Sequence, residues 1–202
     1  MREKGHAGNR PLFASADLDE VREQGGAGVF CPHRLDLTGD LALLNARFNS
    51  AQLGAVRISY LDYAADVRIE PGELESFFLV QIPLAGRSLI RCGGQEIVST
   101  PALASLPSAD GVSWTCGGRR AASQLIVKFE RAAVEKALEQ LLGAPMDRPL
   151  VFDLGLDLTA GWGAGWARHG GPDRRRGPST TTAGQPSRWP SRISRAPCSP
   201  RC

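Results

Sequence analysis

The residues best able to do chemistry in this chain are few and widely separated. Its three histidines are His6, His33 and His169, and its five cysteines form no CxxC pair and have no histidine at ligand spacing. A metal site needs several nitrogen, oxygen or sulfur ligands that converge on one ion. We therefore predict no metal site and no cofactor. The cysteines, which we expect to be reduced thiols, are Cys31, Cys92, Cys116, Cys198 and Cys202.

The motifs of covalent catalysis and of phosphate binding are incomplete. Ser113 lies in the sequence Gly-Val-Ser-Trp-Thr, which lacks the second glycine of a G-x-S-x-G nucleophile turn. The glycines of 161–165 do not have G-x-G-x-x-G spacing and follow no predicted strand. The carboxylates are dispersed over turns and helix surfaces. No residue is a candidate for catalysis, and we expect a protein that is not an enzyme.

Binding is the remaining chemistry, and four aromatic residues on predicted strands are candidates to line a pocket. Tyr60, Tyr63, Phe78 and Trp114 could face a small molecule between two sheets or in the mouth of a barrel. Each of them also fits a hydrophobic core, where such residues are usually found. Strand arginines could meet an anionic effector, although exposure to solvent is equally consistent. These arginines are Arg57, Arg68 and Arg91.

The elements that must position these side chains are short strands, which we predict from 53 to 129. Val56, Ile58 and Tyr60 alternate with polar neighbours, the pattern of a half-buried strand. The alternation resumes at Val67 with opposite parity, so a bulge or turn between the two segments must reset the register.

The later strands are separated by glycine turns and not by helices. Residues 77–84 are almost all apolar, which predicts a strand covered on both faces. Gly93-Gly94 separates two short strand patterns and predicts a β-hairpin. Short strands follow at 103–106 and 112–116, and Leu125, Val127 and Phe129 face one way on the last strand. This succession predicts a mainly β fold, an antiparallel barrel or sandwich.

Helices are predicted before and after the strands. Ser15 is a candidate N-cap for a short helix over 16–24, which the following glycines end. The pattern over 131–142 predicts an amphipathic helix, ended by Gly143, and a further helix is predicted near Asp157. One face of the 131–142 helix carries Val134, Leu138, Leu141 and Leu142. That face either packs on its own barrel or pairs with a second subunit. Both contacts can form if each uses part of the face.

The net charge of +3 is unevenly distributed. Residues 168–202 contain eight arginines and one aspartate, a charge of +7, which leaves −4 on residues 1–167. The same segment contains six prolines, and beyond alanine and glycine its one aliphatic residue is Ile193 and its one aromatic residue is Trp189. Such a segment cannot bury enough apolar surface to fold. We predict a disordered tail, translated out of frame, whose arginines at 174–176 contact polyanions only nonspecifically.

The N-terminal part of the chain predicts its location. Residues 1–11 are polar, form a flexible lead-in and lack the apolar core of a secretory signal. No apolar stretch approaches the roughly 20 residues that span a bilayer. We therefore expect a cytoplasmic protein.

Several runs of sequence carry a family resemblance. Phe13-Ala14-Ser15-Ala16-Asp17-Leu18-Asp19-Glu20 and Val29-Phe30-Cys31-Pro32-His33 come first, and Pro71-Gly72-Glu73-Leu74 then precedes the strand-and-turn run 78–86. Gln124-Leu125-Ile126-Val127, a helix ending Leu141-Leu142-Gly143, and Pro149-Leu150-Val151-Phe152-Asp153 continue it. Over about 12–166 the chain resembles the cupin-like AraC-binding domain of bacterial AraC/XylS-type transcription regulators.

The resemblance implies a cupin-like jelly roll over 12–167 that senses a small-molecule effector or mediates dimerisation. The expected partners are an unknown effector and a second copy or an intact regulator. In such regulators a separate C-terminal domain with helix-turn-helix units binds DNA, and nothing after Trp166 resembles it. We therefore expect contact with DNA only through that missing domain, and none with membranes.

Two alternatives stay open. The chain could be a stand-alone cupin-fold enzyme or small-molecule binder, although metal-binding cupins carry two histidines one residue apart, a pattern not found here. It could also be a nonfunctional truncated product.

Overall fold

The computed structural model describes residues 12–25, 33–71, 74–107, 113–117 and 123–169. All of them belong to one compact unit that spans Met1–Gly171. The predicted lead-in over 1–11 and almost all of the predicted tail over 168–202 lie outside the described residues. The predicted end of the domain at 167 stays a prediction.

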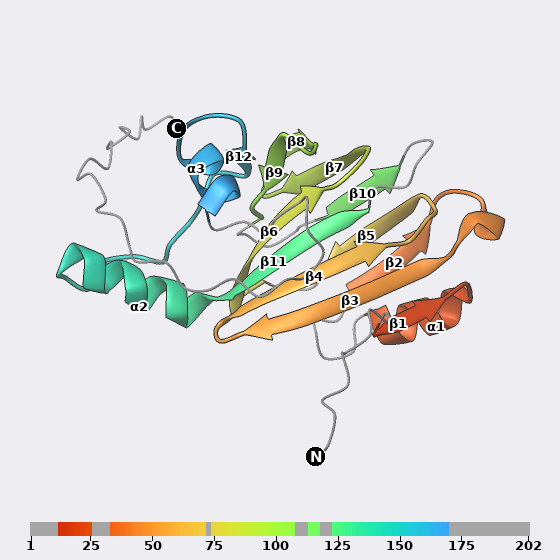
Figure 1. Ribbon diagram of the computed structural model, residues 1–202, viewed down its shortest axis with the longest axis horizontal. Coiled ribbons are helices and arrows are strands. Elements are labelled where there is room, and N and C mark those ends of the chain that lie inside the picture. The colour runs from red at the N-terminus through yellow and green to blue at the C-terminus, as the bar shows by residue number, and fades with distance from the viewer. Residues whose placement is uncertain (1–11, 26–32, 72–73, 108–112, 118–122, 170–202) are drawn as a thin grey trace, which may run out of the picture. The chain divides into compact units, whose positions relative to one another are not determined.

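The described strands form two antiparallel sheets (Figure 1). The seven-stranded sheet contains, in spatial order, β1 (Phe13–Ser15), β3 (Ala46–Leu53), β4 (Val56–Asp62), β11 (Gln124–Glu130), β6 (Phe77–Pro83), β9 (Leu103–Ser105) and β12 (Gly155–Asp157). The five-stranded sheet contains β2 (His33–Leu37), β5 (Val67–Pro71), β10 (Ser113–Gly117), β7 (Arg87–Cys92) and β8 (Gln95–Ser99). The predicted antiparallel β architecture is confirmed.

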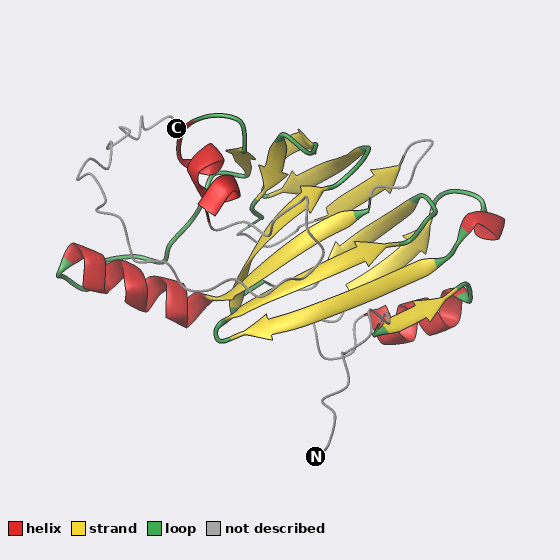
Figure 2. Ribbon diagram, viewed as in Figure 1, coloured by secondary structure: helices red, strands yellow, loops and turns green. Residues whose placement is uncertain are grey.

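The helices are α1 (Leu18–Gly25), α2 (Arg131–Leu142) and α3 (Gly161–His169), with a short 3₁₀ turn η1 at Leu41–Leu43. Between β2 and β11 the one helical segment among the described residues is η1 (Figure 2). The prediction of helices before and after the strand series is therefore confirmed.

The strand β6 is covered on both faces, as its apolar sequence predicts. All seven of its residues are buried. Leu79 belongs to the main core, where it meets residues of the five-stranded sheet such as Ile69 and Ile90. Val80 and Ile82 belong to a second apolar cluster. The seven-stranded sheet is thus apolar on both sides along this strand.

The strand β4 keeps the predicted alternation, but its more deeply buried face is the other one. Ser59 and Leu61 are buried, whereas Val56 and Ile58 are half-buried against the second cluster. The chain then crosses to the other sheet through a turn in which Ala64 has φ of 57°. This crossing is the physical reason for the reversed parity at Val67.

The hairpin and the long helix are located as predicted. Gly93 and Gly94 have φ of 54° and 82° between β7 and β8, values that a two-residue hairpin turn requires. Gly143 ends α2 in the left-handed region, at φ of 69°, and its N–H donates to the Glu139 carbonyl. Glycine adopts this conformation without a steric penalty.

Several boundaries differ from the predictions. The cap of α1 is Asp17, because its Oδ1 accepts from the N–H groups of Asp19 at 2.9 Å and Glu20 at 3.0 Å. Ser15 instead accepts from the Asp17 N–H at 3.0 Å. The helix predicted near Asp157 is α3, which begins at Gly161, because Gly155–Asp157 forms β12 and pairs with β9. Strands β1, β2 and β3 were not predicted.

Candidate functional site

An interior cavity lies between the two sheets. Its free volume is about 10 Å³, which is about the space of one water molecule. The side chains around it are largely apolar, with a few polar groups among them. The lining residues are His33, Leu61, Tyr63, Ile69, Pro71, Leu79, Gln81, Trp114 and Ile126. In this conformation the interior is therefore filled by the protein itself.

Gln81 is a buried polar residue of this lining with an unused hydrogen-bond donor. The residue is 1% exposed. Its Oε1 accepts a hydrogen bond from the Ser105 hydroxyl at 3.2 Å, but its Nε2 has no partner among the described residues. Gln124 is similarly buried, yet its amide donates to the Ser88 hydroxyl at 3.4 Å. A buried donor left without an acceptor costs about 1–3 kcal/mol, so an acceptor atom beside the Gln81 amide would remove this cost.

The structure brings together two of the four predicted pocket residues. Tyr63 and Trp114 line the cavity. Phe78 points to the other face of β6, where Arg131 lies above its ring. Tyr60 donates a hydrogen bond to Asp62 at 3.2 Å outside the cavity. Burial raises the pKa of the Tyr60 phenol, and the adjacent Asp62 carboxylate raises it further.

The strand arginines do not line the cavity either. Arg68 pairs with Glu70 at 2.7 Å, and Arg91 pairs with Glu96 at 2.7 Å, with all four side chains substantially exposed. Such exposed pairs contribute little to stability. The described geometry thus favours solvent exposure over contact with an enclosed anion.

The sequence reasoning missed Gln81 and His33. Gln81 is a single polar residue in the apolar run of β6, at a position that points inward like Leu79. A lone polar residue at an inward position of a buried strand could have indicated a polar group in the cavity lining, because a buried polar side chain needs a hydrogen-bond partner. His33 gave no signal, since the other lining residues come from strands distant in the sequence.

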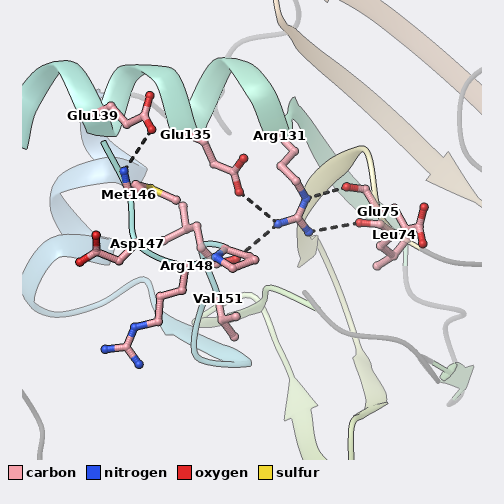
Figure 3. A pocket seen from close by; sticks show the side chains of 11 residues that line it. Leu74, Glu75, Arg131, Glu135, Glu139, Met146, Asp147, Arg148 and Val151 are labelled. Atoms are coloured by element: carbon pink, nitrogen blue, oxygen red, sulfur yellow. Dashed lines mark hydrogen bonds and ion pairs between the residues drawn. The ribbon is translucent and has the colours of Figure 1, made fainter. Parts of the chain in front are cut away.

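A second, open groove of about 800 Å³ lies outside the barrel (Figure 3). It is bounded by α2, by the segment 146–151 and by Leu74 and Glu75. Its carboxylates, Glu75, Glu135, Glu139 and Asp147, outnumber its guanidinium groups, Arg131 and Arg148. The groove is a wide surface channel, whereas the interior cavity is enclosed.

The predicted dimer-helix residues lie on a helix that buries little of itself. Val134 and Leu138 are half-buried, while Leu141 is 71% and Leu142 51% exposed. The contacts of α2 with the sheet involve β11 and β6, the strands at its N-terminal end. The outer half of the leucine face is therefore open to solvent.

Two further findings concern only the described residues. They contain no cluster of three or more His, Cys, Asp or Glu side chains that could bind a metal ion. None of their helices is long and apolar enough to cross a membrane.

Comparison with known proteins decides the family. A profile described as an AraC-binding-like domain matches residues 23–171. The chain belongs to this family. The chain is 31% identical, over 169 residues, to the "Probable thc operon regulatory protein" of Rhodococcus erythropolis. That alignment covers 82% of this chain and 51% of the relative, so the chain spans about half the length of the curated relative it matches.

Solved structures similar to this AraC-binding-like domain have low identity. The AraC-like transcriptional activator CuxR has a TM-score of 0.45 at 16% identity, covering 66% of this chain and 52% of that one. A Cupin 2 conserved barrel domain protein from Salinispora arenicola has a TM-score of 0.37 at 15% identity, covering 52% and 90%. A variant of the oxalate decarboxylase of Bacillus subtilis has a TM-score of 0.29 at 9% identity, covering 76% and 53%.

Proposed function

We propose that this AraC-binding-like domain is a regulatory sensor that binds a small effector in its interior cavity and catalyses no reaction. The observation that carries the proposal is the buried amide of Gln81, which faces an enclosed, largely apolar space with an unused donor. Similarity to a regulatory protein supports the role. A regulator that acts on promoters works in the cytoplasm, which agrees with the location expected from the sequence.

The lining defines the chemical class of effector. Apolar side chains such as Leu79 and Ile126 favour an apolar body, and Trp114 offers an aromatic surface. The Gln81 N–H requires an acceptor such as a carbonyl oxygen. We therefore propose a small, mainly apolar carbonyl compound. Because the free volume holds only about one water molecule, such a guest must displace lining side chains and move the two sheets apart.

A matched pair of probes tests this assignment. Acetophenone carries a carbonyl acceptor, and ethylbenzene has nearly the same shape without one. We expect acetophenone to shift the Gln81 side-chain amide resonance in NMR spectra and to bind at least about tenfold more tightly than ethylbenzene, because only it satisfies the donor. In the Gln81→Leu variant, acetophenone and ethylbenzene should bind equally tightly. Equal binding of the two probes by the native chain, or binding of neither, would contradict the proposal.

The second role proposed for the chain is self-association through α2. Leu141 and Leu142 are exposed on a helix that packs on its own sheet only at its N-terminal end, and exposed apolar stripes on helices commonly bury against a partner. The proposed partner is a second copy of this chain.

Charge substitution on the leucine face tests the proposed dimer. Leu141→Glu should weaken dimerisation by about 100-fold or more, because a buried unpaired carboxylate is costly, while Gln140→Glu on the exposed face serves as the matched control. Sedimentation equilibrium measures both. A Leu141→Glu chain that associates as tightly as the control would refute the assignment.

A further inference from the structure

Two strands that line the interior cavity lead to the start of α2. β6 contributes Leu79 and Gln81 to the lining, and its neighbour β11 contributes Ile126. β11 ends at Glu130 and α2 begins at Arg131, with no residue between them. Because close-packed interiors transmit strain, a guest that displaces these strands also displaces the first turn of α2.

Phe78 connects the cavity-lining strand to Arg131. Neighbouring residues of a strand point to opposite faces, so Phe78 lies on the outer face where Leu79 lies on the inner one. The guanidinium carbon of Arg131 is 4.2 Å from the centroid of the Phe78 ring, an arrangement in which the π-electrons attract the cation. Phe152 meets the same ring edge-on, with centroids 5.0 Å apart.

The guanidinium of Arg131 also donates hydrogen bonds to three backbone carbonyls (Figure 3). Its Nε donates to Glu75 at 2.6 Å, its Nη2 to Leu74 at 3.4 Å and its Nη1 to Leu150 at 3.4 Å. Nη1 also lies 3.5 Å from the carboxylate of Glu135. The planar fork of donors makes this possible, and the single ammonium of a lysine cannot match it.

The backbone adds to this junction. The Arg131 N–H donates to the Ser76 carbonyl at 3.0 Å, and the Glu130 N–H donates to the Ala55 carbonyl at 3.1 Å. The helix begins without a side-chain cap. Its N-terminal end is therefore positioned by tertiary contacts, and most of these contacts involve one side chain.

We propose that Arg131 is a positioning residue that couples the interior cavity to the orientation of α2. Displacement of β6 moves Phe78, and Arg131 passes that movement to α2 and to the segment around Leu150. The inference rests on the proposed function, since an effector would be the natural cause of the displacement. Its test uses no effector, so the two proposals can fail separately.

A double-mutant cycle measures the coupling. Trp114→Phe perturbs the cavity from the opposite sheet, and hydrogen exchange of the α2 amides is compared in the native and Arg131→Met backgrounds. Coupling between distant sites commonly amounts to about fivefold or more. We expect Trp114→Phe to change α2 exchange by at least about fivefold with Arg131 present and by less than about twofold without it. Exchange of the β4 amides corrects for any change in global stability, because β4 is paired on both sides, with β3 and β11.

Controls separate coupling from simple destabilisation. Arg148→Met removes the other groove guanidinium, which makes no ion pair or hydrogen bond with the described residues, and the response of α2 should persist in that background. If Arg131→Met does not fold, Arg131→Lys keeps the charge without the fork, and the α2 response should be reduced. An α2 response to Trp114→Phe of equal size in all backgrounds, or no response in any, would overturn the proposal.

Discussion

Replacing Trp114 by alanine is expected to lower the free energy of unfolding by about 3–5 kcal/mol, the range for a buried tryptophan. Trp114 is 7% exposed. It lies on the strand between β5 and β7, opposite Ile69 and Ile90, so these neighbours cannot collapse into the space without breaking the sheet. The substitution should leave a large apolar cavity beside Gln81.

Added indole should return part of the lost stability. An apolar cavity of this kind binds small aromatic molecules, and a ligand that binds only the folded state stabilises it in proportion to the logarithm of its concentration. Urea unfolding with and without indole measures both effects. Trp162, which is 62% exposed, provides the control, since Trp162→Ala should cost less than about 1 kcal/mol. A loss below about 1 kcal/mol in Trp114→Ala, or equal stabilisation of both variants by indole, would contradict the assignment of the interior site.

Gly163→Ala is expected to cost about 3 kcal/mol, the upper part of the range for overpacking, although alanine is normally the better helix former. A Cβ at this position would overlap the carbonyl oxygen of Asp157 and would lie 3.0 Å from a methyl group of Leu156. The obstacle is the backbone of β12, which is held by its pairing with β9. Helix α3 would have to move outward, separating Ala164 from its buried position.

The neighbouring Gly165 supplies the matched control. A Cβ there meets no atom within 4 Å, so Gly165→Ala should stabilise the chain by about 0.5–1 kcal/mol through helix propensity alone. Thermal unfolding of the two variants should therefore shift in opposite directions. Similar shifts would show that α3 is not closely packed on β12.

The sequence predicted best where local signals and tertiary contacts agree. The hairpin of β7 and β8 has glycines at both left-handed positions, and α2 has helical periodicity and a terminal glycine. By contrast, β3 reads Ala-Arg-Phe-Asn-Ser-Ala-Gln-Leu, which has no clear alternation. Its strand conformation depends on seven residues of pairing with β4, and such long-range pairing leaves no local signal.

The faces of the strands were harder to predict than the strands themselves. A period-2 pattern indicates which residues share a face of the sheet. It shows which of the two faces is buried in the core only when the other face is exposed to solvent. In β4 both faces meet apolar clusters, so Val56 and Ile58 alternate correctly and yet are less buried than Ser59. The same difficulty applies to the site. Tyr63 and Trp114 reach the cavity, whereas Tyr60 does not line it and Phe78 is buried on the opposite face of its sheet.

The direct junction of β11 and α2 has a mechanical consequence. A helix of 12 residues is about 18 Å long at about 1.5 Å per residue, and α2 has no loop at its base to absorb rotation. A tilt of about 10° where the strand ends would carry the far end of the helix through about 3 Å. Leu141 and Leu142 are located at that far end, so a small rotation where the strand ends would displace the exposed leucines by about 3 Å.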